Sequence, residues 1–520
     1  MLFHAPIFLL VFLPITLSLY LWMERRAPAG ASIGFLAFAS LIFYGWWNPL
    51  YLPLLLGSMV FNFVVGRAIA PDAGTSARKA LLIVGIAANL GVLALFKYAD
   101  FAIRTINVLS DRNLPEWGIL LPLAISFFTF QQIAFLADSY QGKAPERSFP
   151  AYCLFITFFP HLIAGPIVHH SEMMPQFARL YSGDRRSAEE VWRDLAVGFA
   201  IFAIGLAKKV FFADRFATWS DNVFRAADAG LELSFIEAWL GTACFTLQIY
   251  LDFSGYSDMA IGLARLFGVK LPLNFDSPYK ATSIIEFWRR WHMTLSRFLR
   301  DYLYVPLGGN RQGATRRYLN VMIVMLLGGL WHGASWTFVL WGGLHGLYLM
   351  INHAWRAWAA RGGPRIGTVA GGLLTLLAVM IAWVFFRAES FDGALRLLRA
   401  MAGFDGIALP FHWQPGFGRL IAWEPFASIF HFKPMPAYSG GNQIAWVVLG
   451  FLAMWLLPNT QEIMRKWHPA FEAVAAPRGI QAWITWRPNA LTGVVFAAMT
   501  LAVTIIVLQG KAGEFIYFQF

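Results

Sequence analysis

One long stretch of this chain carries no Asp, Glu, Lys or Arg, and it constrains the fold more than any other feature. It runs from Tyr318 to Trp355. A helix needs only ~20 apolar residues to cross a membrane, so the stretch is long enough for more than one crossing. His332 lies inside it, and a rise of about 1.5 Å per residue from Arg317 would place it ~22 Å deep. An imidazole at that depth is costly, which indicates a functional site at His332.

The composition extends this conclusion to the whole chain. Of the 520 residues, 58% are hydrophobic and 13% are charged, which is typical of a protein that crosses the membrane many times. We expect an all-α polytopic membrane protein with about 11 to 13 transmembrane helices, because some apolar segments are paired or re-entrant. The candidate segments are 4–22, 31–48, 51–69, 80–97, 117–138, 151–168, 195–213, 235–252, 254–268, 319–331, 334–352, 367–386, 443–458 and 489–508.

The net charge of +12 indicates basic cytoplasmic loops near anionic lipid. A nucleic-acid-binding surface is not expected, because no soluble stretch is long enough to form one. Basic residues follow the first, third and fifth candidate spans, so the positive-inside rule places the N-terminus outside. The N-terminus lacks a basic region of the signal-peptide kind, and we expect the first helix to be retained. Cys153 and Cys244 have neither disulfide nor metal-ligand spacing.

The segment 284–304 is predicted to be a helix that lies in the membrane interface. Ser283 and Glu286 form a capping box at its start. Basic residues fall on one face and Trp and Leu on another, as in interfacial helices. The basic face either contacts lipid headgroups or attracts an anionic substrate such as a coenzyme A phosphate. Its residues are Arg289, Met293, Arg297 and Arg300, whereas His292 lies on the aromatic face.

A second polar cluster occupies 248–258, inside an otherwise apolar stretch. Carboxylates in such a place must be paired or hydrated. Asp252, Ser254 and Asp258 could line a tunnel, orient a histidine or bind a substrate hydroxyl. The two carboxylates could equally pair with Arg265 or another basic residue for packing, and the sequence leaves these alternatives open.

Two further segments are given structural interpretations. His161, His169 and His170 cluster around 159–170, but no adequate set of carboxylates or cysteines completes a metal site, so a re-entrant loop held by prolines and a glycine is expected. The segment 403–442 mixes Pro, Gly and aromatic residues, and we expect it to form an interfacial loop on the outer side. A second capping box, Ser187 to Glu190, predicts a helix start.

Several motifs together resemble the membrane-bound O-acyltransferase (MBOAT) family. Within that family they are most similar to the branch that contains the membrane subunits of bacterial alginate O-acetylation. The resemblance covers nearly the whole chain. Its most specific parts are 286–292 (EFWRRWH), 301–309 (DYLYVPLGG) and 331–336 (WHGASW) continuing to His345-Gly346. The segments 159–166, 248–258, 383–388 and 458–459 match the same branch.

The resemblance implies a fold and an active site. The fold is a ring of helices around a thinned membrane centre, with a central tunnel from a cytoplasmic donor site to an outer acceptor site. His332 takes the place of the family's active-site histidine, and His292 that of a second active-site position. Trp331, beside His332, is expected to contact substrate. Whether His332 removes the hydroxyl proton or carries the acyl group stays open.

The implied function is acetyl transfer from a cytoplasmic thioester toward an exported polysaccharide. Acetyl-CoA is the expected donor, and alginate is the expected acceptor. No bound cofactor is expected. Separate periplasmic acetyltransferase proteins are the expected partners, and the bacterial inner membrane is the expected location. The chain 1–520 is interpreted as one domain, with a catalytic core at about 150–355.

Three alternatives were weighed. Acetyl or D-alanyl transfer to teichoic acid, cellulose or peptidoglycan would use the same fold. A proton-coupled transporter with a midplane histidine would need paired half-repeats, which the sequence does not show. A catalytically silent scaffold would have no need for both His292 and His332.

Overall fold

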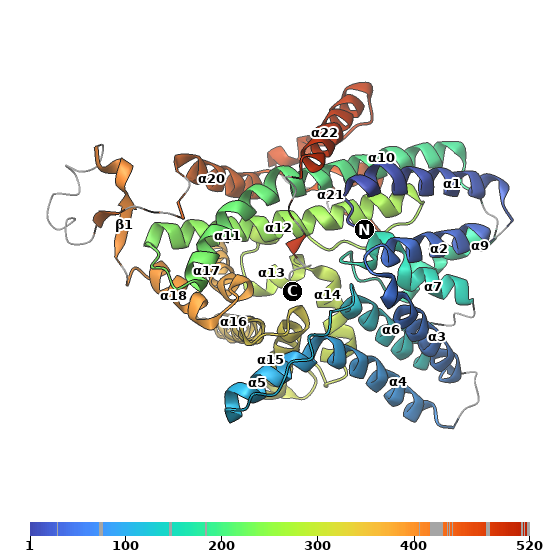
Figure 1. Ribbon diagram of the computed structural model, residues 1–520, viewed down its shortest axis with the longest axis horizontal. Helices are drawn as coiled ribbons and strands as arrows, with labels where there is room; N and C mark the ends of the chain where they lie inside the picture. Colours follow the sequence, from blue (N-terminus) through green and yellow to red (C-terminus); the bar gives the residue numbers. More distant parts are fainter. Residues whose placement is uncertain are drawn as a thin grey trace.

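The structure, a computed structural model, describes residues 1–28, 30–71, 76–144, 148–182, 185–404, 406–415, 430–433, 435, 437–438, 440–474, 479–510, 513 and 515–516. Helices form nearly all of its regular structure (Figure 1), so the all-α prediction is confirmed. Two short strands, β1 (Ile407–Pro410) and β2 (Phe430–Lys433), pair in parallel with Ile407 opposite Phe430.

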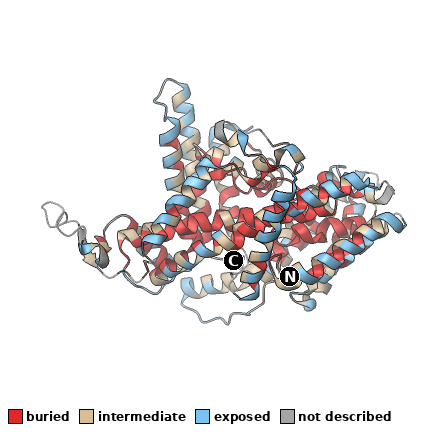
Figure 2. Ribbon diagram, turned by 90° about the horizontal axis from the view of Figure 1, so that it is seen from above, coloured by how far each residue is buried: buried red, intermediate tan, exposed pale blue. Residues whose placement is uncertain are grey.

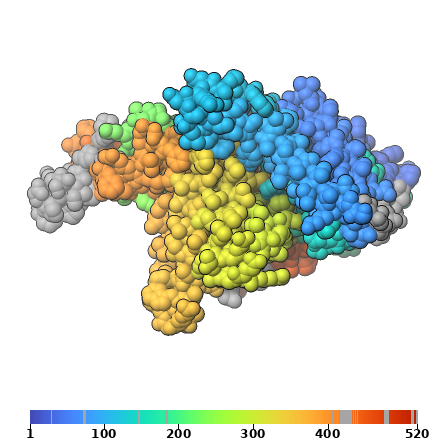
Figure 3. Space-filling model, turned by 90° about the horizontal axis from the view of Figure 1, so that it is seen from below, coloured from blue at the N-terminus to red at the C-terminus, as the bar shows by residue number. Residues whose placement is uncertain are grey.

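The N-terminal helices form one side of the molecule (Figure 1). Figure 3 shows them in blue beside the yellow and gold residues that follow the centre of the chain. They are η1 (Phe8–Phe12), α1 (Leu13–Arg26), α2 (Ala31–Gly45), η2 (Pro49–Tyr51), α3 (Leu52–Ala68), α4 (Arg78–Leu93), η4 (Ala94–Tyr98), α5 (Ala99–Ser110), α6 (Ile125–Tyr140), α7 (Phe149–Thr157), α8 (Phe159–Leu162) and α9 (His170–Ser182).

The middle of the chain, above all α12 (Phe235–Leu266), supplies much of the buried interior, which is drawn in red in Figure 2. Its elements are α10 (Ala188–Ala207), η5 (Lys208–Ala213), α11 (Asp214–Asp228), α12 (Phe235–Leu266), η6 (Pro278–Lys280), α13 (Ile284–Arg290), α14 (Met293–Leu299), η7 (Arg300–Tyr304), α15 (Gly313–His332), α16 (Trp336–Ala360), α17 (Thr368–Arg387) and α18 (Phe391–Met401). The C-terminal part adds η8 (Phe411–Trp413), α20 (Gly441–Leu456), α21 (Thr460–Met464), η10 (Arg465–Trp467), η11 (Gly479–Trp483) and α22 (Ala490–Leu508).

Six helical stretches of the described chain are long and apolar enough to cross a membrane, and a seventh if the bent pair 441–456 and 460–467 counts as one span. The expected 11 to 13 crossings exceed this number. The long helices α12, α15 and α16 are not among the six. In α12, the apolar residues are interrupted by buried polar ones such as Asp252, Asp258 and Arg265. The six are Phe8–Arg26, Pro49–Ala68, Arg78–Ser110, Ala188–Asp228, Thr368–Arg387 and Ala490–Leu508.

Two predicted boundaries were wrong. The segments 235–252 and 254–268 form a single helix, α12, and the segment 117–138 becomes helical only at Ile125. Gly255 does not break α12 but brings it against α10. A Cβ on Gly255 would lie 2.8 Å from the Gly205 oxygen, and a Cβ on Gly205 would lie 2.5 Å from the Gly255 oxygen. Small residues therefore allow two membrane helices to approach at backbone distance.

Buried ion pairs and hydrogen bonds hold the ends of the central helices to the N-terminal part. Arg186 pairs with Glu24 at 2.7 Å and with Asp194 at 3.1 Å, and Tyr20 donates to the Phe267 oxygen at 2.9 Å. The capping box of Ser187 and Glu190 at the start of α10 is confirmed. The predicted outer loop 403–442 lies partly outside the described residues, which omit 416–429, so its place stays a prediction.

Candidate active site

His332 is the last residue of α15. The helix ends there because Gly333 is extended, and Ser335 then begins α16 by accepting from the Thr337 N–H at 3.3 Å. The His332 side chain is only 5% exposed. Its ring packs edge-to-face on Trp341 at 5.1 Å and on Phe386 at 5.3 Å between centroids. The imidazole is therefore held in an apolar, aromatic pocket at the end of a helix.

The C-terminus of α15 is held by two side chains from η4. Lys97 Nζ donates to the Trp331 oxygen at 2.5 Å and to the His332 oxygen at 3.2 Å, and the Tyr98 hydroxyl donates to the Leu330 oxygen at 3.0 Å. The last carbonyls of a helix have no partner within it, and a cation there is favoured by the helix dipole. The sequence does not mark Lys97 as a site residue. No local signal connects it to His332, because the two are far apart in the chain.

His292 lies at a break in the segment predicted as one helix over 284–304, and that prediction was wrong. The helix α13 ends at Arg290, and Trp291 is extended. His292 then adopts a left-handed conformation with φ 43°, and α14 starts at Met293. Left-handed non-glycine residues are uncommon and are found at functional sites. Ser283 caps α13 as predicted by accepting from the Glu286 N–H at 3.3 Å, but the Glu286 carboxylate accepts from the Thr282 N–H at 2.8 Å and not from Ser283, so only half of the capping box forms.

Asn274 holds this break and orients the His292 ring. Its backbone oxygen accepts from the Met293 N–H at 2.9 Å, and its side-chain oxygen accepts from Thr294 Oγ1 at 2.9 Å. Asn274 Nδ2 donates to Ser257 Oγ at 3.2 Å, which assigns the amide orientation. His292 Nδ1, 2.9 Å from Asn274 Oδ1, must then be the donor. Neutral His292 therefore keeps a lone pair on Nε2, which has no hydrogen-bond partner among the described residues.

The two histidines form one layer. Their ring centroids are 6.4 Å apart, and Trp331 lies beside both, at 6.2 Å from His292 and 5.0 Å from His332. His292 is fully buried. The structure thus brings together three of the residues predicted from the sequence, although 39 positions separate His292 from Trp331 (331 − 292).

Two cavities lie near this layer, and only the smaller one is lined by residues of the layer itself. One, of about 70 Å³, is lined by Lys97, Trp331, His332 and Phe515 together with residues 121–127 and 163–164. The other, of about 550 Å³, is lined by residues of α14 and by Val324 of α15. Val324 precedes His332 by eight residues (332 − 324), or ~12 Å of helix, so the cavities lie at different depths along α15. The predicted continuous tunnel between the two faces stays a prediction.

The larger cavity contains all three arginines of the predicted basic face. Arg289, Arg297 and Arg300 line it together. Arg297, however, makes a two-pronged ion pair with Glu172 at 2.5 and 2.9 Å, and Arg300 pairs with Asp301 at 2.7 Å. Arg289 has no ion pair within the described part of the chain. Of the two arginines expected to bind substrate, Arg289 is therefore available to a ligand, whereas Arg297 is already engaged.

Asp252 and Asp258 are ion-paired within the fold. Asp252 lies 3.0 Å from Lys209, and Asp258 lies 2.7 Å from Lys208. Neither lines the two cavities beside the histidines. Arg265, their suggested partner, pairs with Asp194 instead. The packing alternative therefore accounts for both carboxylates, and a substrate-binding role stays a prediction.

Ser254 and the histidines of the 159–170 segment line neither cavity, and a substrate-binding role for Ser254 stays a prediction. Ser254 is buried, and its hydroxyl has no hydrogen-bond partner in the described chain. His161 lies 3.3 Å from Gln131, and His169 lies 3.2 Å from the Tyr302 hydroxyl. Within the described residues no group of three His, Cys, Asp or Glu side chains is placed to hold a metal ion.

Comparison with known proteins assigns this arrangement to a family. The sequence model of the MBOAT, membrane-bound O-acyltransferase family, matches residues 145–388. The peptidoglycan O-acetyltransferase of Helicobacter pylori is 44% identical over 436 residues, covering 79% of this chain and 81% of that protein. The probable alginate O-acetylase AlgI of Azotobacter vinelandii is 41% identical over 411 residues, covering 78% of each chain. The protein of the same name from Pseudomonas aeruginosa is 40% identical over 411 residues, covering 78% of this chain and 75% of that one.

The chain belongs to the membrane-bound O-acyltransferase family. It is a multi-pass membrane protein and an acyltransferase, as the motifs around His292 and His332 predicted.

Proposed function

We propose that this acyltransferase moves an acetyl group from a cytoplasmic thioester to a hydroxyl group destined for an exported polysaccharide. The observation that carries the proposal is the buried pair of His332 and His292, with one cavity lined by His332 and another lined by Met293 and Thr294, which follow His292. Relatives named for alginate and for peptidoglycan support a polysaccharide acceptor. A bacterial inner membrane is the location that fits an exported acceptor and a cytoplasmic donor.

In the proposed reaction, a hydroxyl oxygen attacks the carbonyl carbon of the thioester. As the C–O bond forms, the hydroxyl proton passes to the unprotonated ring nitrogen of His332. The C–S bond then breaks, and the leaving thiolate takes that proton from the imidazolium. A hydroxyl is a weak nucleophile at neutral pH, so a positioned base supplies much of the rate. His292, with its lone pair on Nε2, orients one of the reactants.

Two acceptors are proposed, alginate and peptidoglycan, and one experiment distinguishes them. In the source bacterium, deletion of the gene is expected to remove base-releasable acetate from one of these polymers, and expression of the chain to restore it. Acetate is measured separately on exopolysaccharide and on muropeptides. Separate periplasmic acetyltransferase proteins are proposed to complete the transfer. Unchanged acetate on both polymers after deletion would contradict a polysaccharide acceptor.

His292→Ala is expected to lower the rate of acetyl transfer by about 10²-fold without abolishing it, because the residue orients a reactant while His332 moves the proton. His292→Asn is the companion variant, since asparagine tolerates the left-handed backbone of this position. Rates are measured on purified protein at several donor concentrations. Wild-type rates in His292→Asn would remove His292 from the site.

The donor is proposed to be acetyl-CoA, bound in the 550 Å³ cavity with its phosphates near Arg289. Arg289→Ala is expected to raise the donor KM by about three- to fivefold and to leave kcat nearly unchanged, because an exposed charge contributes equally before and during the chemical step. The wild-type KM should also rise with added salt.

Arg311→Ala is the matched control for this prediction. Arg311 is exposed, has no ion pair in the described chain and does not line the cavity. An identical donor KM in Arg289→Ala and wild type, with no salt response in either, would show that Arg289 does not meet the donor. Arg297→Ala is unsuitable, because it would leave Glu172 without its partner.

A further inference from the structure

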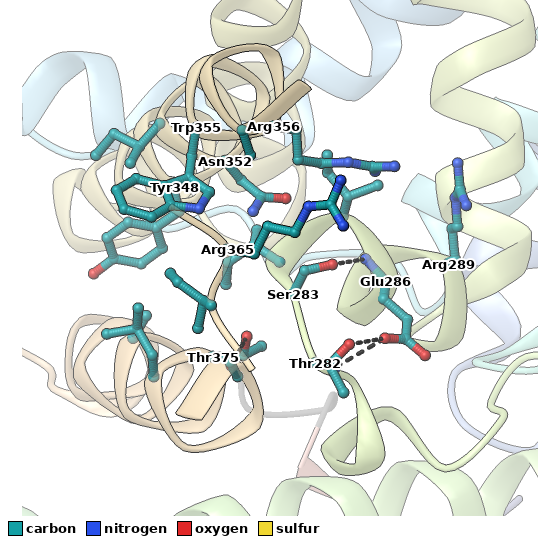
Figure 4. A pocket seen from close by; sticks show the side chains of 18 of the residues that line it. Thr282, Ser283, Glu286, Arg289, Tyr348, Asn352, Trp355, Arg356, Arg365 and Thr375 are labelled. Carbon is teal, nitrogen blue, oxygen red and sulfur yellow. Dashed lines mark hydrogen bonds between the residues drawn. The ribbon is translucent and has the colours of Figure 1, made fainter. Parts of the chain in front are cut away.

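A third and larger cavity, of about 960 Å³, lies between α13, α16 and α17 and includes neither His332 nor His292. Three arginines from three elements line it: Arg289 from α13, Arg356 from α16 and Arg365 from the loop after α16. Figure 4 shows Arg356 and Arg365 reaching toward the same space, with Arg289 across from them. We call this cavity the arginine groove.

The positive charge of the arginine groove is not balanced by the protein. None of the three arginines has an ion pair among the described residues. The one carboxylate that lines the groove, Glu286, pairs with Arg290 at 2.9 Å and accepts from Thr282 at 2.8 Å. Guanidinium groups that converge without a counter-charge repel one another, and a bound anion relieves that repulsion. The groove therefore favours an anionic ligand.

One wall of the groove is largely apolar and belongs to a membrane helix. Its wall includes Leu374 and Ala378 of α17, and α17 is one of the six helices able to span the membrane. Trp355 lies on the α16 side, and tryptophan is enriched where membrane meets water. The ligand that fits this surface has a negative head and an apolar tail.

The groove also lies at the cytoplasmic side of the predicted orientation. The start of α15 carries Arg316 and Arg317, and the end of α16 carries Arg356 and is followed by Arg361. Figure 3 shows the gold residues near the end of α16 projecting from the rest of the molecule. Basic residues beside a span attract the anionic lipids of the cytoplasmic leaflet.

We propose that the arginine groove binds one anionic phospholipid of the cytoplasmic leaflet, with its phosphate between Arg356 and Arg365 and an acyl chain along α17. The lipid lies beside the donor cavity, because Arg289 borders both. The lipid phosphate lies at Arg356 and Arg365, which do not line the donor cavity, and the proposal does not depend on which acceptor is used.

The test is lipid retention by the purified full chain, measured by native mass spectrometry after addition of phosphatidylglycerol or phosphatidylcholine. The wild type is expected to retain one phosphatidylglycerol in preference to phosphatidylcholine. Arg356→Ala and Arg365→Ala should each lower that retention about tenfold, the loss expected for one charged hydrogen bond. Arg361→Ala removes the same charge from the same loop but outside the groove, and should retain the lipid like wild type.

Three outcomes would overturn the proposal. Equal retention of the two lipids would show that the negative charge is not recognised. Equal losses in all three variants would show attraction to overall charge and not to the groove. If Arg356→Ala and Arg365→Ala raise the KM for acetyl-CoA while phosphatidylglycerol retention is unchanged, the groove holds phosphates of the soluble donor and not a lipid.

Discussion

His332→Ala is expected to reduce polymer-linked acetate by roughly 10²- to 10⁴-fold, the contribution of a positioned general base, while the protein still inserts and accumulates. The imidazole is buried against Trp341 and Phe386, and these apolar rings cannot take the hydroxyl proton in its place. Acetate is measured in a deletion strain that expresses the variant, and protein level is followed in the same membranes.

The control for this prediction is His468→Asn. His468 is exposed and has a left-handed backbone that asparagine tolerates, so this variant should behave like wild type. Near-normal acetate in His332→Ala at normal protein level would remove His332 from the chemistry. Acetylation would then have to depend on His292 or on a group outside this layer.

Lys97→Met is expected to lower kcat by about 10²-fold and to change the donor KM little, because a displacement of about 1 Å at a reacting group has an effect of that size. Lys97 does not reach the His332 ring through any described hydrogen bond. It holds the backbone oxygens of Trp331 and His332, and so sets where α15 ends. Methionine keeps the length of the side chain but leaves those carbonyls without a donor.

Lys97→Arg and Tyr98→Phe separate this positioning role from general destabilisation. Arginine still donates to the two carbonyls and should restore part of kcat. Tyr98→Phe removes only the bond to the Leu330 oxygen, one residue further from the histidine, and should have the smaller effect. A folded Lys97→Met with wild-type kcat would contradict the role. A loss of kcat in proportion to a loss of folded protein would show that Lys97 is needed only for stability.

The elements that could be predicted from the sequence are those specified by nearby residues. Long apolar runs became helices, and the Ser187–Glu190 capping box began α10, because helical hydrogen bonds and caps join residues within four positions of one another. The expected membrane depth of His332 rests on the same regular rise and stays a prediction. The helix predicted over 284–304 failed for the opposite reason. Its break at His292 is held by Asn274, which lies 18 positions away (292 − 274) and carries no local signal.

By itself, the sequence determined that the chain is helical and crosses the membrane, and that His332 and His292 lie in motifs of an acyltransferase family. Only the tertiary structure decided how charges and histidines are partnered. Asp252 pairs with Lys209, Arg297 pairs with Glu172, and Lys97 donates a hydrogen bond to the end of α15. In an apolar medium a charged side chain needs a partner, and the sequence contains several residues of opposite charge that could serve. The choice among them depends on which helices pack together, and contacts between distant segments set that packing.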